Sequence, residues 1–114
     1  SHGMKQKLAV IGAVLPDPPL LILDEPLTGL DPKSSALFKD LMRRRCDEGK
    51  AVFFSTHVLD VAERVCDRIA IINRGRLIAE GTMDELRASA AGGTTLERIF
   101  LDLTAEQERE DGAW

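Results

Sequence analysis

The stretch from residue 20 to residue 32 reads Leu-Leu-Ile-Leu-Asp-Glu-Pro-Leu-Thr-Gly-Leu-Asp-Pro and decides the fold. Its four apolar residues, Leu20 to Leu23, predict a short strand buried on both faces, as in a parallel sheet. Asp24 and Glu25 follow at the carboxyl end of that strand, where ligands of open parallel sheets gather. Adjacent carboxylates there can hold a hard cation through water and orient an attacking water. The simpler interpretation is an acidic turn closed by Pro26.

A helix is expected directly after this stretch. Asp31 and Pro32 are typical of an N-cap followed by proline at the first helical position, so capping alone explains Asp31. The helix is expected to run to Glu48 and to end at Gly49. Three apolar residues are expected on its inner side: Leu37, Leu41 and Met42.

A second strand is expected over residues 51–55, and His57 lies just beyond it. Parallel strands end at the same edge of a sheet, so His57 is expected beside Asp24 and Glu25. A lone histidine after a strand is usually only a polar loop residue. Its position beside the two acids favours a functional role.

These motifs resemble the nucleotide-binding domain of ABC transporters. The family's Walker B strand matches residues 20–25, its D-loop residues 28–31 and its H-loop residues 55–57. The course from the H-loop helix to the last core strands matches three further stretches: 58–63, 67–76 and 80–82. The similarity covers residues 1 to about 88 without a gap, with the motifs in order. The resemblance implies an α/β fold, a partial P-loop NTPase (RecA-like) parallel sheet with flanking helices and a C-terminal β-hairpin.

The first residues are similar to the family's signature motif, Leu-Ser-Gly-Gly-Gln. Ser1 and Gly3 stand at matching positions, whereas His2 and Met4 depart from the motif. The alternative is a remnant of a cloning tag. The next apolar residues recur at helical spacing and predict a helix, much as exporter subunits continue after their signature: Leu8, Ile11 and Leu15.

The chain contains no Gly-x-x-x-x-Gly-Lys-Ser/Thr motif, the loop that holds the β- and γ-phosphates. We therefore expect the carboxy-terminal half of an ATPase domain, present as a split product, a proteolytic fragment or an excised piece. By itself it is expected to bind ATP poorly and to lack appreciable ATPase activity. In the family's sheet the absent Walker A strand lies between the strand ending at Ser55 and the one beginning near Arg68. We expect a second copy to fill this gap, or the two strands to close on each other.

The rest of the chain predicts a hairpin and two helices. The hairpin comprises strands over 67–73 and 76–80, at the edge of the sheet. A capping box at 82–85 begins a helix that ends near Ser89. These residues complete the first predicted domain, 1–89.

Residues 90–114 are predicted to form a C-terminal helix and an acidic tail. A link over 90–93 precedes a second capping box at 94–97. The helix either docks onto its own domain or contacts another subunit, through four residues on one face: Leu96, Ile99, Phe100 and Leu103. The acidic residues from Glu106 onward are expected to form a solvated, frayed end.

Composition agrees with a cytoplasmic protein that reaches a membrane only through a transmembrane partner. Of 114 residues, 44% are hydrophobic, and no stretch approaches the ~20 apolar residues that span a bilayer. The net charge of −4 argues against nucleic acid as a partner. Cys46 and Cys66 are expected to be reduced thiols, and no metal cage of protein ligands is expected.

The resemblance implies a role for each matched residue. Glu25 would polarise the water that attacks the γ-phosphate of ATP, Asp24 would hold Mg²⁺ through its water shell, and His57 would contact the γ-phosphate. Asp31 would cross a dimer interface. Ser1 and Gly3 would donate to the γ-phosphate of the partner's nucleotide.

The implied partners are a second ATP-binding domain, in a homodimer or heterodimer, and a transmembrane transporter subunit. The parent protein would couple ATP hydrolysis to transport, with export favoured by the residues after the signature. Two alternatives stand beside this. One is a soluble ATPase of the same superfamily in DNA repair or chromosome maintenance. The other is a non-catalytic half-domain that self-associates.

Overall fold

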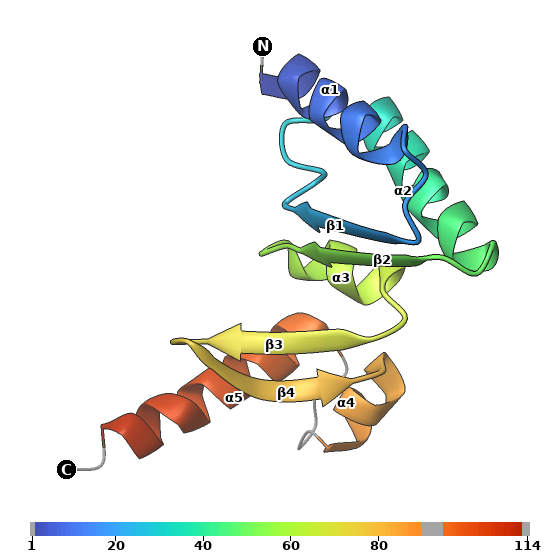
Figure 1. The fold of residues 1–114 in the computed structure, drawn as a ribbon. Helices are drawn as coiled ribbons and strands as arrows, with labels where there is room; N and C mark the ends of the chain where they lie inside the picture. Colours follow the sequence, from blue (N-terminus) through green and yellow to red (C-terminus); the bar gives the residue numbers. More distant parts are fainter. Residues whose placement is uncertain (1, 90–94, 113–114) are drawn as a thin grey trace. The chain divides into compact units, whose positions relative to one another are not determined.

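The computed structural model describes residues 2–89 and 95–112, which form a mixed α/β structure of two compact units. The first unit ends at His57 and the second begins at Val58. Each unit contains its own two-stranded sheet (Figure 1).

The first unit is a β-α-β arrangement preceded by a helix. It consists of α1 (His2–Val14), β1 (Leu20–Asp24), α2 (Pro32–Asp47) and β2 (Ala51–Ser55). The two strands pair in parallel, so that Leu20 lies opposite Ala51 and Asp24 opposite Ser55. Parallel strands need a crossover connection, and α2 provides it. The buried apolar residues of this unit are Val10, Leu21, Phe38 and Met42.

Two expectations for the first unit are wrong. The first strand is covered on one face only, because Leu21 is buried whereas Leu20 and Ile22 are 49% and 67% exposed. Successive side chains of a strand point to opposite faces of the sheet. Among the described residues, other side chains cover the face that carries Leu21 and leave the opposite face largely exposed. On α2, Leu37 is 59% exposed, and Phe38 takes the inner position.

The buried face of α2 includes an arginine. Because the hydrophobic pattern counts arginine as polar, it predicted the wrong face of this helix as the buried one. Arg45 is only 4% exposed and follows Phe38 and Met42 at helical spacing. Its guanidinium donates to the Asp17 carboxylate over 3.1 Å and to the Pro18 carbonyl over 2.5 Å. A buried charge requires such partners. The hydrogen bond from Lys50, together with that from Arg45, lowers the pKa of Asp17.

The second unit consists of a hairpin and three helices. Its elements are α3 (Leu59–Val65), β3 (Ile69–Asn73), β4 (Arg76–Gly81), α4 (Met83–Ser89) and α5 (Leu96–Asp111). The predicted hairpin is confirmed, with Arg74 and Gly75 both at positive φ, as a tight two-residue hairpin turn requires. Within this unit, β3 and β4 form a two-stranded antiparallel sheet of their own.

The core of this unit confirms that α5 docks onto its own unit. Leu96 and Ile99 are each 1% exposed and pack with Ile71 and Leu86, while Phe100 and Leu103 are partly buried against the same cluster. The capping box before α4 is also confirmed, because Thr82 Oγ1 accepts from the Glu85 amide over 3.1 Å.

Two expectations for α5 need correction. The N-cap is Thr95, whose side chain accepts from the Arg98 amide, so capping is one residue later than predicted. The predicted link over 90–93 and Thr94 lie outside the described residues. The predicted frayed end is also wrong, because α5 remains helical to Asp111. The carboxylate of Asp111 accepts a hydrogen bond from Arg76 over 2.5 Å. The partners that hold this end come from the hairpin, which the local sequence did not reveal.

Candidate functional site

The predicted site residues meet at the carboxyl-terminal edge of the parallel sheet. Asp24 is the last residue of β1 and lies opposite Ser55, the last residue of β2. The Ser55 hydroxyl donates to the Asp24 carboxylate, and the Glu25 amide donates to the Ser55 carbonyl over 2.9 Å. The register of the two strands therefore places both acids beside the segment that leads to His57.

Glu25 and His57 are in direct contact. The His57 amide donates to Oε1 of Glu25 over 2.8 Å, and the ring Nδ1 forms a hydrogen bond with the same oxygen. The other carboxylate oxygen has a longer contact, 3.5 Å, with the Thr28 hydroxyl. The Glu25 side chain is 29% exposed, and that of His57 is 82% exposed. One oxygen of Glu25 therefore has two hydrogen bonds with His57, while the other makes only the longer contact with Thr28.

The environment favours the ionised form of Glu25. Partial burial raises the pKa of this carboxyl, but the hydrogen bonds from the His57 ring and amide outweigh it, so that the pKa lies below its ordinary value. Glu25 is therefore a carboxylate at neutral pH. It can accept a hydrogen bond from water and then a proton.

Asp31 is the N-cap of α2, as its sequence position predicted. Its carboxylate accepts from the Ser34 amide over 3.2 Å and from the Ser34 hydroxyl over 2.6 Å. Lys7 of α1 approaches the same carboxylate to 3.4 Å. The Ser34 hydrogen bonds, with a smaller contribution from Lys7, lower the pKa of Asp31 to about 2. This side chain has a complete structural role within its own unit.

The first turns of α1 pack against the loop that joins Glu25 to Asp31. A Cβ atom at Gly3 would lie 2.6 Å from the Gly29 carbonyl oxygen, so the close approach requires glycine there. Three residues later, Gln6 donates to the backbone carbonyl of Glu25 over 3.0 Å. Gly3, predicted as a phosphate donor, therefore also has a packing role, while Ser1 lies outside the described residues.

Sequence reasoning missed Gln6 and Lys7. A signal for Gln6 was present, because residues three apart on a helix share a face, and Gly3 already matched a motif. The partners of these side chains could not be inferred, since the loop lies 19 or more residues farther along the chain.

The carboxylates fit a hard cation held through water. Among residues 2–89 and 95–112, no group of three or more His, Cys, Asp or Glu side chains could hold a metal ion directly. Asp24 and Glu25 supply oxygen donors at one sheet edge, the donor type that Mg²⁺ takes alongside retained waters and substrate phosphates. Asp24 and Glu25 therefore fit a Mg²⁺ ion whose direct ligands are mainly water and substrate phosphates.

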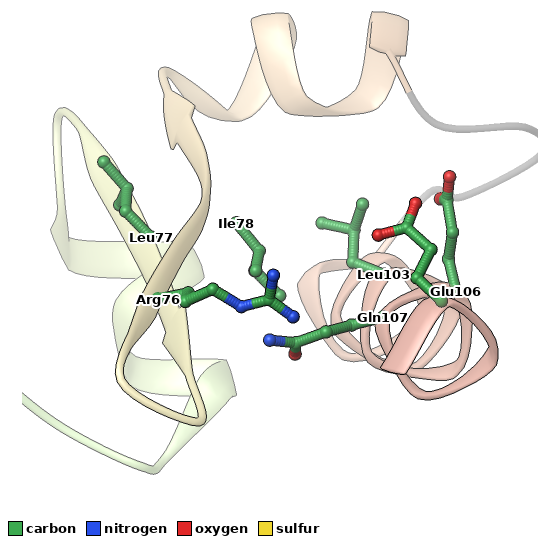
Figure 2. Close-up of a pocket in the computed structure, with 7 residues that line it drawn as sticks. Arg76, Leu77, Ile78, Leu103, Glu106 and Gln107 are labelled. Carbon is green, nitrogen blue, oxygen red and sulfur yellow. The ribbon is translucent and has the colours of Figure 1, made fainter. Parts of the chain in front are cut away.

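A separate cleft lies between β4 and α5, as Figure 2 shows, and none of the predicted site residues lines it. In the figure, Arg76 extends from the strand toward Gln107 of the helix. Across the described part of the chain, no helix is long and apolar enough to cross a membrane.

The sequence of the chain is similar to those of several known proteins. Residues 1–59 match the family described as "AAA domain, putative AbiEii toxin, Type IV TA system". The chain is 43% identical over 97 residues to Nod factor export ATP-binding protein I of Rhizobium leguminosarum bv. viciae, covering 85% of this chain and 31% of that protein. It is 42% identical over 110 residues to daunorubicin/doxorubicin resistance ATP-binding protein DrrA of Streptomyces peucetius, covering 96% of this chain and 33% of that protein. The chain thus spans about a third of the length of these relatives.

Solved structures show the same likeness. The ATP-binding subunit of an ABC transporter matches with a TM-score of 0.85 and 40% identity, over 91% of this chain and 44% of that one. A dimeric ATP-binding cassette in a post-hydrolysis state, bound to ADP and Pi, matches with a TM-score of 0.65 and 29% identity, over 72% of this chain and 35% of that one.

Proposed function

The chain belongs to the ATP-binding proteins of ABC transporters, and from this premise we propose that it forms the carboxy-terminal half of the ATP-hydrolysing domain of an exporter. One relative is named for Nod factor export and another for resistance to two drugs, which supports export. The observation that carries the catalytic part is the contact between the Glu25 carboxylate and His57 at the sheet edge.

Glu25 acts as the general base in this proposal. Its carboxylate oxygen Oε2, which has only the longer contact with Thr28, accepts a proton from water as the water oxygen bonds to the γ-phosphorus of ATP. The bond from that phosphorus to the β–γ bridging oxygen breaks, and the products are ADP and phosphate. His57, which is largely exposed while its Nδ1 faces Glu25, is free to contact the γ-phosphate with its other ring nitrogen.

Asp24 would hold Mg²⁺ through the ion's water shell, and its side chain is oriented by the Ser55 hydroxyl. When bound, Mg²⁺ would supply positive charge that offsets the charge of the phosphates. The chain contains no phosphate-binding glycine-rich motif with lysine, so we propose that it does not hydrolyse ATP by itself.

The complete site would need two domains. We assign Asp31 to the interface with a second ATP-binding domain, and Ser1 and Gly3 to the γ-phosphate of the partner's nucleotide. The similarity to a dimeric cassette bound to ADP and Pi supports this arrangement. A transmembrane subunit would be the further partner, placing the protein on the cytoplasmic side of a membrane.

The test uses a longer protein that contains this chain and a phosphate-binding loop. Glu25→Gln should lower kcat by about 100-fold or more, because an amide cannot accept the proton, while ATP affinity stays within about twofold. Glu48→Gln, at the exposed C-cap that follows α2, is the matched control and should retain the wild-type kcat. If Glu25→Gln hydrolysed ATP near the wild-type rate, Glu25 would not be the base.

A second candidate function is favoured for the chain alone. Ile22 and Phe53 lie opposite each other in the parallel register and are 67% and 65% exposed. Adjacent exposed side chains of this kind favour a non-catalytic half-domain that self-associates.

A further inference from the structure

The backbone of Glu25 has an unusual conformation. Its φ is 47°, in the left-handed region that residues with a Cβ rarely adopt. Such a conformation persists only where the surroundings hold it. The turn matters here because it directs the Glu25 carboxylate to the His57 amide and ring. A relaxed φ would turn the carboxylate away from both groups.

Two donors hold the carbonyl of this residue. Thr28 donates its amide to the Glu25 carbonyl oxygen over 3.2 Å, which closes the turn locally. Gln6 donates its Nε2 to the same oxygen over 3.0 Å from a different element. Together they occupy both lone pairs of the carbonyl and oppose its rotation. Gln6 is half-buried, so the hydrogen bond is partly shielded from water.

We propose that Gln6 is a positioning residue for Glu25, holding the backbone turn that directs its carboxylate to His57. The proposal rests on the proposed function, in which Glu25 is the base. Gln6 acts through the backbone carbonyl of Glu25, whereas His57 and Thr28 contact the carboxylate that would take the proton.

The neighbouring contacts show that α1 holds the whole loop. Gly3 packs against the Gly29 carbonyl, Gln6 binds the Glu25 carbonyl, and Lys7 pairs with the Asp31 carboxylate. The three contacts lie within the first two turns of α1, and their partners extend from the first residue of the loop to its last. The helix that begins with the signature-like segment is thereby linked to the predicted base within one unit. A displacement of its first turns would displace Glu25.

Two substitutions of Gln6, one that removes its N–H donor and one that keeps an N–H donor, test the proposal in the longer ATPase. Gln6→Glu keeps the shape but removes the N–H donor, and should lower kcat about tenfold or more with the KM for ATP within about twofold. Gln6→Lys restores an N–H donor of similar reach and should recover most of the wild-type kcat. Both replacements favour helices, so helix propensity does not separate them.

The matched control is Lys5→Gln, an exposed neighbour on the same helix, which changes the net charge by the same amount as Gln6→Glu. It should leave kcat unchanged. A wild-type kcat for Gln6→Glu, or an equal loss in Gln6→Lys, would overturn the proposal. If instead Glu25→Gln retained turnover, the proposed function itself would fail, so the two failures are distinguishable.

A measurement on the 114-residue chain requires no activity. The His57 amide donates to Glu25, so its hydrogen exchange reports whether the carboxylate is in place. Gln6→Glu should accelerate this exchange about fivefold or more relative to Lys5→Gln, with the exchange of β4 amides in the second unit unchanged. Equal exchange of the His57 amide in the two variants would contradict a positioning role.

Discussion

Asp31 has structural partners both close to it in the sequence and on another helix. Its hydrogen bonds with Ser34 cap α2, and Lys7 pairs with it from α1. The cap was predictable because its partner is three residues away, whereas the ion pair with α1 was not. Gly3 shows the converse, since the sequence suggested a ligand-binding role and the structure added a packing role.

The lowered pKa of Asp31 predicts a pH dependence of stability. The folded pKa is about 2 and the ordinary value is 3.8, so the ionised carboxylate favours folding fully above about pH 4. That contribution is lost as pH falls through the folded pKa. Asp31→Asn keeps a capping oxygen but carries no charge. It should unfold at lower urea concentration than the wild type at pH 7, with the difference closing between about pH 4 and pH 2.

Urea titrations of both proteins across this pH range measure the effect. A wild-type advantage that stayed constant down to pH 2 would show that charge at Asp31 is not the cause.

At the scale of elements, α5 is held by an apolar face and by polar contacts at its far end. Gln107 is 4% exposed and forms two hydrogen bonds with Asn73. The side-chain amide of Asn73 donates to Oε1 of Gln107 over 2.6 Å, and Nε2 of Gln107 donates to the backbone carbonyl of Asn73 over 3.0 Å. Buried amides need such partners. Asp111 accepts from Arg76 on the next strand. The helix therefore extends along the hairpin to the last residues that the structure describes.

The apolar face of α5 should carry most of its docking energy. Ile99 is 1% exposed, and Ile99→Ala should lower the free energy of unfolding of the second unit by about 2 to 5 kcal/mol, through lost burial and a residual cavity. Leu101→Ala, at a 50% exposed position on the same helix, should change it by less than about 1 kcal/mol. Urea unfolding followed by circular dichroism compares the two variants. Similar losses in both would mean that Ile99 does not anchor the helix.

At the scale of the whole molecule, each sheet leaves strand edges and apolar side chains uncovered. β2 pairs only with β1, and β3 only with β4, among the described residues. Phe53 on β2 and Ile72 on β3 are 65% and 66% exposed. Exposed edges of this kind are templates for pairing with another chain.

We predict that the chain forms a dimer or larger oligomer at micromolar concentration, burying apolar surface along residues 51–55 and 68–73. Light scattering measures the mass. Phe53→Lys should shift the distribution toward the monomer, because a buried lysine charge opposes association. Leu37→Lys, at a 59% exposed position on α2, is the control and should leave the mass unchanged. A folded monomer with exchange-protected amides in both β2 and β3 would contradict the prediction.

Local sequence was enough to predict most helices and strands and the sheet edge at which Asp24 and Glu25 meet His57. Those features depend on caps, glycine turns and hydrophobic periodicity, which act over a few residues. The covered faces of the elements, the burial of Arg45 and the hydrogen bond from Gln6 to Glu25 became visible only in the folded structure. These depend on side chains that meet across 28 residues for Arg45 and Asp17 and across 19 for Gln6 and Glu25. No local pattern encodes such pairs, because the partners lie far apart in the sequence and meet only when the elements that carry them pack together.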